Sequence, residues 1–417
     1  MKIIKYILIT LFSFLCSNKL LIPMDITQTD HLKAYGITFW SLGKDKNVDW
    51  LLNYRGGSFM MDNSPEAQSE CLIRGVKFEI INASQLADIL STINDNNMDI
   101  VLLETIPKIA VYSPPGKQPW DDAVTLALTY AEVDYDIIFD EEVLSGFLSK
   151  YDWLHLHHED FTGQYGKFYK NYRNREWYQK MEAEFNYTAT QFGFKSVHDL
   201  KKNIAFEIKK YITKGGFLFA MCSATDSYDI ALSAINTDIA HQVFDGTPID
   251  SDYQERLDFS NTIAFENFEL YTDPMIYEYS TIDVPPGHKP IAKGAEEDYF
   301  TLFEFSAKWD PVPAMLTQNH VGVINGFMGQ TTAFDREKIK KHVTILAEVE
   351  NQNIVKYIHG NVGKGSFTFL GGHDPEDYRH MVGDPPTDLS LHRNSPGYRL
   401  ILNNILFPSA RKKDRKT

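Results

Sequence analysis

Short apolar runs alternate with amphipathic segments along most of the chain. Between residues 18 and 106, strand-like runs such as KLLIPM and MDIVLLETI alternate with helical segments such as TDHLKAYGITFWSL and SQLADILSTIND. Apolar residues recurring every three or four positions indicate helices, and short continuous apolar runs indicate buried strands. Because this alternation is typical of an α/β layer, we expect an N-terminal α/β domain over residues 18–106.

The alternation starts again after Pro107. The runs KIAVYS, YDWLHLHH, GGFLFAM and GSFTFLGG indicate strands, with helical patterns between them. Two segments interrupt the pattern: residues 160–200 are aromatic and charged and are expected to be helical, and residues 244–320 are expected to be rich in β-structure. We therefore predict a second domain over residues 107–417, built on a doubly wound, mostly parallel sheet with these two insertions.

The N-terminus has the pattern of an export signal. Two lysines precede an apolar run that ends in small and polar residues, and this run is shorter than the roughly twenty residues of a membrane span. We predict a signal peptide over residues 1–17 and a periplasmic or secreted protein. Cys16 also allows lipoprotein anchoring, but Leu15 before it is not the small residue typical of that signal. No later run is long enough to predict an integral membrane segment.

The net charge limits the classes of binding partner, and the cysteine content limits the number of disulfides. The 417 residues carry a formal net charge of -15, which argues against nonspecific nucleic-acid binding. We expect a small-molecule, sugar or peptide ligand instead, while the sequence does not indicate an oligomeric state. Removal of Cys16 would leave Cys71 and Cys222, which are too few for a disulfide framework.

Cys222 lies where a predicted strand turns into a helix. Such a corner exposes the side chain at its tip and requires small residues two positions before and after, here Ala220 and Ala224. The start of a helix favours a thiolate, so Cys222 is a candidate nucleophile. The alternative is a small, inert residue buried at the end of a strand.

Histidines follow two other predicted strands. In HLHHED, His155 and His157 face one way on a strand, and with Glu159 they are candidate metal ligands; hydrogen-bonded histidines at a sheet edge are the alternative. In GGHDPED, Glu376 could orient His373, or the segment could be a glycine turn followed by solvated acids. The sequence therefore requires no cofactor but allows a divalent metal.

Parallel strands end at one edge of a sheet, where α/β proteins bind their ligands. We therefore expect His157, His158, Cys222 and His373 to converge. The candidate substrate-binding residues at this edge are His157, His158, Ser113, Gly116 and Ser223.

Residues 108–407 resemble the class I glutamine-amidotransferase-like fold, including its trehalose-utilisation-type and biotin-ligase-N-terminal-like branches. The resemblance rests on the order of KIAVYSPPG, YDWLHLHH, GGFLFAMCSA, GKGSFTFLGGHDPE and GYRLILNNILF. It implies Cys222 as nucleophile, His373 as base and Glu376 as its partner. Alanines replace the glycines of the family's Gly-x-Cys-x-Gly motif, and His157-His158 stands where the family has a glycine pair.

The whole chain is also similar to exported bacterial proteins that carry the label asparagine synthetase B, through LLIPMD, DWLLNYRGGSF and HLHHEDFTGQYGKFY. The motifs do not support that label. Lys2 stands where the catalytic cysteine would follow Met1, and SATDS lacks the glycines that contact pyrophosphate.

Two main hypotheses follow. The first is an exported thiol-dependent amidase or hydrolase that uses Cys222 and His373. The second is a non-catalytic protein that binds a ligand or a metal on the same fold, and metal-dependent hydrolysis is a third reading.

Overall fold

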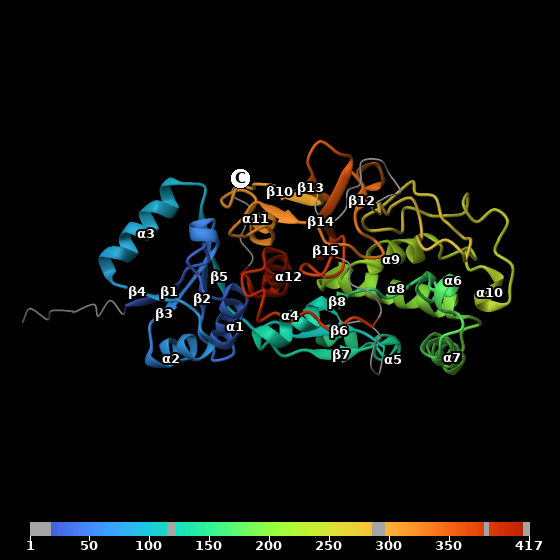
Figure 1. Cartoon of the computed structure of the whole chain (residues 1–417), viewed down its shortest axis with the longest axis horizontal. Coiled ribbons are helices and arrows are strands. Elements are labelled where there is room, and N and C mark those ends of the chain that lie inside the picture. Colours follow the sequence, from blue (N-terminus) through green and yellow to red (C-terminus); the bar gives the residue numbers. More distant parts are fainter. Residues whose placement is uncertain (1–17, 115–121, 286–296, 379–382, 412–417) are drawn as a thin grey trace, which may run out of the picture.

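The computed structural model describes residues 18–114, 122–285, 297–378 and 383–411, so the predicted signal peptide and Gly116 lie outside the described residues. The N-terminal part forms a five-stranded antiparallel sheet in the order β4-β1-β3-β2-β5 (Figure 1). Its strands are β1 (Lys19–Ile22), β2 (Val48–Leu52), β3 (Ser58–Asp62), β4 (Glu79–Ile81) and β5 (Asp99–Leu103), and its helices are α1 (His31–Leu42), α2 (Pro65–Arg74) and α3 (Ala83–Asp95).

The remaining strands form a ten-stranded mixed sheet. Nine of them follow the order β11-β10-β13-β14-β15-β9-β8-β6-β7, and β12 pairs with β14 beside this path. Neighbours from β15 to β7 are parallel, whereas those from β11 to β15 are antiparallel. The strands are β6 (Ile109–Tyr112), β7 (Asp136–Ile138), β8 (Trp153–Leu156), β9 (Phe217–Met221), β10 (Tyr299–Leu302), β11 (Val323–Asn325), β12 (Phe334–Asp335), β13 (Thr344–Val349), β14 (Ile354–Val362) and β15 (Gly365–Leu370).

Helices pack on both faces of the parallel half. Alternation along β9 sends Phe217 and Phe219 into one core with α4 and α12, and Leu218 and Ala220 into another with α8 and α9. The helices that follow the N-terminal part are α4 (Ala123–Ala131), α5 (Asp140–Leu144), α6 (Tyr169–Tyr172), α7 (Glu176–Gln191), α8 (Val197–Lys214), α9 (Ser223–Ser233), α10 (Gln242–Asp245), α11 (Pro311–Leu316) and α12 (Pro396–Leu406). None of the described helices has the length and apolar character needed to cross a membrane.

Helix α12 joins the two sheets. It lies between them in Figure 1, and it packs against α1 and α4. Its Arg399 is fully buried and donates hydrogen bonds to the backbone oxygens of Met24 (3.0 Å) and Gly56 (2.7 Å), both in segments between strands of the N-terminal part. One apolar core consequently includes residues of both sheets.

The general α/β class predicted from the alternation is confirmed, and the four strands expected to end at the site are neighbours in one sheet. Two details differ. The sheet is mixed rather than mostly parallel, because the long hairpin β14–β15 reverses the chain and adds antiparallel strands beyond it. The described part of 244–320 is mostly irregular rather than rich in β-structure, and its strand β10 belongs to the main sheet instead of lying outside it.

Leu218 tests the importance of the central strand β9. Its side chain is fully buried, so Leu218→Ala should leave a cavity and lower the free energy of unfolding by about 2–5 kcal/mol. The matched control Leu72→Ala removes a side chain that is 72% exposed on α2 and should cost less than about 0.5 kcal/mol. Urea titration followed by circular dichroism measures both, and equal effects would contradict the assigned core.

Candidate functional site

The register of three parallel strands brings the predicted site residues to one edge. Leu156 pairs with Ala220, and Met221 pairs with Leu370. The residues that follow β8, β9 and β15 therefore emerge side by side, as expected at the carboxyl edge of a parallel sheet. Backbone bonds fix this arrangement: Cys222 N donates to Gly372 O at 3.1 Å, and Ala224 N donates to His157 O at 3.2 Å.

Three histidines form the centre of this edge. His157, His158 and His373 each offer a ring nitrogen, and the three nitrogens lie within 4.8 Å of one another. The ring of His157 lies 4.2 Å from that of His373 and 4.5 Å from that of His158, centroid to centroid. Zn²⁺ binds imidazole nitrogens at about 2 Å, so nitrogens this close to one another can share one ion after small side-chain rotations.

Asp122 lies beside two of the histidines at this edge, His155 and His157. Its Oδ2 lies 3.4 Å from His157 Nδ1 and 3.3 Å from His155 Nε2. A carboxylate beside Nδ1 favours the proton on that nitrogen and leaves Nε2 as the acceptor. Nε2 of His157 is buried and has no hydrogen-bond partner among the described residues, so it is available as a ligand atom.

The pKa values of Asp122 and His158 are both shifted from their usual range. Burial would by itself raise the pKa of Asp122, but His155 and His157 hold the pKa of this carboxyl well below its usual range. Burial, followed by the neighbouring imidazoles of His157 and His373, lowers the pKa of His158 well below its usual value. A neutral imidazole, which the lowered pKa favours at His158, is the form in which a histidine binds a metal.

Cys222 occupies the strand-to-helix corner predicted for it. It directly precedes α9 and has φ 52° and ψ -140°, a left-handed backbone that is strained for a residue with a side chain. Ala220 and Ala224 are fully buried, in agreement with the need for small residues at these positions. The corner is therefore built as a nucleophile elbow would be.

The thiol of Cys222 is nevertheless enclosed. Gln330 N donates to its Sγ at 3.2 Å, and a methyl group added at Gly329 would lie 2.9 Å from that Sγ and 3.2 Å from His373 Cβ. The thiol and His373 thus flank the same chain segment. Burial raises the pKa of the thiol, although the backbone amides of Thr331, Gln330 and Ser223 oppose this shift. A buried, protonated thiol is a poor nucleophile in this conformation.

Other predicted site residues take different positions. Glu376 pairs with His392 at 3.0 Å, so it does not take the expected place as the partner of His373. Ser113 lines a separate cavity of about 910 Å³ beside β7 and α7, and Ser223 donates its hydroxyl hydrogen to His158 O at 3.0 Å. Glu159 does not join His155 and His157 as a ligand; it is buried near Lys201, and burial raises its pKa to about 8.

Asp122 was missed in the sequence analysis. Its other oxygen accepts hydrogen bonds from Val124 N and Thr125 N and so caps α4. An aspartate just before a helical run is a recognisable capping signal. Its contact with His155 and His157 depends on α4 beginning beside the end of β8, and the sequence alone does not show this arrangement.

Two further buried carboxyls lie under the segment that covers Cys222. Asp226 accepts a hydrogen bond from Thr331 Oγ1 at 2.9 Å, and Asp283 accepts one from Thr332 N at 3.1 Å. Burial raises the pKa of Asp226 to about 7 and the pKa of Asp283 well above its usual value. The second oxygen of each carboxyl has no hydrogen-bond partner among the described residues, so ionisation of either acid opposes folding.

No protein-family model and no curated protein matches the chain. Among solved structures, two cytoplasmic proteins of Salmonella typhimurium, one of them from strain LT2, match 73% of this chain and 100% of their own at 11% and 10% identity, each with a TM-score of 0.36. A beta-galactosidase from Bacillus circulans sp. alkalophilus matches 66% of this chain and 29% of its own length at 11% identity, with a TM-score of 0.26. These similarities are too low to assign a function.

The enclosed thiol predicts slow alkylation. In the native chain at about pH 8, iodoacetamide should label Cys222 at least about ten times more slowly than in urea, because the thiol is buried and protonated. Cys71 is a matched control, since it is also fully buried and burial raises its pKa to about 12. Mass spectrometry of tryptic peptides measures both rates. Rapid labelling of Cys222 alone would show that the sulfur is open and activated.

The raised pKa of Asp226 predicts that the stability of the fold depends on pH. Between about pH 4 and 7 the unfolded chain has lost the proton that folded Asp226 retains, so this group lowers stability as pH rises through that range. Asp226→Asn keeps the oxygen that accepts a hydrogen bond from Thr331 but cannot ionise. The free energy of unfolding should therefore fall by about 2 kcal/mol less in this variant than in the unmodified chain between about pH 5 and 7. The exposed Asp134→Asn controls for the lost charge. Urea titrations at both pH values measure the free energy of unfolding. If it changed with pH equally in the two variants, Asp226 would not be the group responsible.

Proposed function

We propose that this protein is a metal-dependent hydrolase whose metal site is formed by His157, His158 and His373. The observation that carries the proposal is the convergence of three ring nitrogens within 4.8 Å of one another, with Asp122 behind one of them. Three imidazoles are a common ligand set of catalytic zinc sites, which keep a further position open for water or substrate.

The roles of the residues follow from their positions. His157, His158 and His373 would hold the ion, and Asp122 is a positioning residue that fixes the tautomer of His157. A divalent ion bound there would polarise a substrate oxygen and acidify a bound water. Imidazole ligands suit Zn²⁺, Cu²⁺, Fe²⁺ and Ni²⁺ rather than Mg²⁺ or Ca²⁺. The substrate class is a small molecule, sugar or peptide.

A thiol-dependent amidase is the second candidate, and the strained elbow at Cys222 favours it. The resemblance to the glutamine-amidotransferase-like fold supports the same reaction, with His373 as base. This chemistry requires the segment that contains Gly329 and Gln330 to uncover the sulfur. A protein on this fold that binds a metal or ligand without turnover is the remaining reading.

We also propose export to the periplasm or the medium, on the basis of the apolar N-terminal run. Cell fractionation and N-terminal sequencing should find a mature chain that begins near Asn18 outside the cytoplasm. Uncleaved protein confined to the cytosol would contradict the proposal.

Metal binding tests the proposal directly. Equilibrium dialysis with Zn²⁺ followed by elemental analysis should find about one ion per chain. His373→Ala should lose most of this binding, and the exposed His342→Ala should retain it. Asp122→Asn keeps an oxygen to cap α4 and should weaken affinity by about 10–100-fold. Equal binding by all four proteins would rule out the site.

A chelator and the Cys222→Ser variant distinguish the metal-dependent mechanism from the thiol-dependent one. Hydrolysis of nitrophenyl ester or anilide substrates that is abolished by a chelator, restored by Zn²⁺ and retained in Cys222→Ser supports the metal site. Activity that survives the chelator and is lost in Cys222→Ser supports the thiol. Stoichiometric metal binding without turnover of any substrate in such a panel indicates a binding protein.

A further inference from the structure

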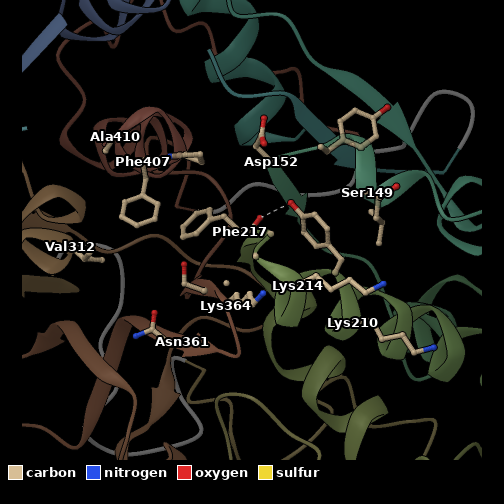
Figure 2. Close-up of a pocket in the computed structure, with 18 of the residues that line it drawn as sticks. Ser149, Asp152, Lys210, Lys214, Phe217, Val312, Asn361, Lys364, Phe407 and Ala410 are labelled. Atoms are coloured by element: carbon tan, nitrogen blue, oxygen red, sulfur yellow. Dashed lines mark hydrogen bonds between the residues drawn. The ribbon is translucent and has the colours of Figure 1, made fainter. Parts of the chain in front are cut away.

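A second cavity lies at the opposite end of the same strands. Asp152, Phe217 and Ser366 stand at the amino ends of β8, β9 and β15 and line a space of about 670 Å³ (Figure 2). The histidines and Cys222 follow the carboxyl ends of these strands, so this cavity is separate from the proposed metal site. Its volume lies within the range of about 300–1,000 Å³ that is usual for small-ligand sites.

One part of the cavity wall is apolar. Phe217 and Met315 are buried beneath it, and the half-buried Val312 and Phe407 lie beside them. In Figure 2, Phe407 and Val312 lie on one side of the space and Lys210 and Lys214 on the other. The cavity thus has an apolar side and a side that carries lysines, and the acidic residues Asp152 and Glu207 also line it.

Two lysines on the rim are without an ion pair in the part of the chain that the structure describes. Lys214 and Lys364 line the cavity, and no carboxylate of the described residues lies within ion-pair distance of either. Lys210, on the same helix, is already paired with Glu207 at 2.7 Å. Two exposed lysines without an ion-pair partner among the described residues thus line one cavity of a chain whose net charge is -15.

The backbone holds these two lysines close together. Lys364 N donates to Thr213 O at 3.0 Å, and Gly363 approaches the same residue so closely that an added methyl group would lie 2.6 Å from Thr213 O. The negative end of the α8 dipole accounts for a lysine at position 214, which ends that helix. It does not account for Lys364, which stands in the turn between β14 and β15.

We propose that this cavity binds a small amphipathic anion, namely a carboxylate with an apolar chain or ring. Lys214 and Lys364 attract the carboxylate, and the apolar body packs against Phe217, Val312 and Phe407. Charge complementarity and apolar burial then act on opposite ends of one ligand. This site does not depend on the chemistry proposed for the histidines.

Decanoate, with decanol as its neutral analogue, is a suitable probe. Isothermal titration of the full chain should show saturable decanoate binding that Lys214→Gln/Lys364→Gln weakens by about five-fold, the scale of two exposed charge interactions. Decanol should bind the unmodified chain more weakly than decanoate does. Lys44→Gln is the charge control: Lys44 is exposed and does not line the cavity, so this change should leave decanoate affinity unchanged.

Three results would overturn the proposal: no saturable decanoate binding by the unmodified chain, equal affinity for decanol and decanoate, or equal decanoate affinity in the double variant. An equal loss in Lys44→Gln would also reject it, because the effect would then follow overall charge. Circular dichroism confirms that each variant is folded, and all three changes are at exposed positions.

Discussion

The parallel pairing of β8, β9 and β15 is the constraint on which the candidate site depends. Its register places His157, Cys222 and His373 at one edge, although more than two hundred residues separate the first from the last. Backbone hydrogen bonds between the strand ends then hold the groups in place. A shift of one residue in any of these strands would turn its terminal side chain to the other face of the sheet.

Two different chemistries meet at this edge. The imidazoles of His157, His158 and His373, with Asp122 beside His157, are arranged as metal ligands would be. Cys222 has the strained backbone of a nucleophile, but its sulfur is covered and its pKa is raised. Burial acts on both groups, because it raises the pKa of the Cys222 thiol and lowers the pKa of His158. A neutral imidazole binds metals, whereas a neutral thiol does not attack.

The opposite edge of the sheet differs in character. There the cavity under Lys214 and Lys364 combines unpaired positive charge with an apolar wall, in a molecule that is strongly acidic overall. Between the two edges, the same strands supply the buried core. Helix α12 and its buried Arg399 tie this core to the N-terminal sheet, so the two sheets share one apolar interior.

The sequence by itself determined the elements that depend on local pattern: the alternating strands and helices, the strand-to-helix corner at Cys222, and histidines at two strand ends. These follow from periodicity, capping and the small residues around the corner, which act over a few neighbouring positions. Only the tertiary structure decided which groups meet. Asp122 rather than Glu159 stands behind the histidines, Glu376 turns to His392, and Gln330 covers the thiol. Each of these contacts joins segments distant in the chain, and such pairings are set by sheet order and packing rather than by local sequence.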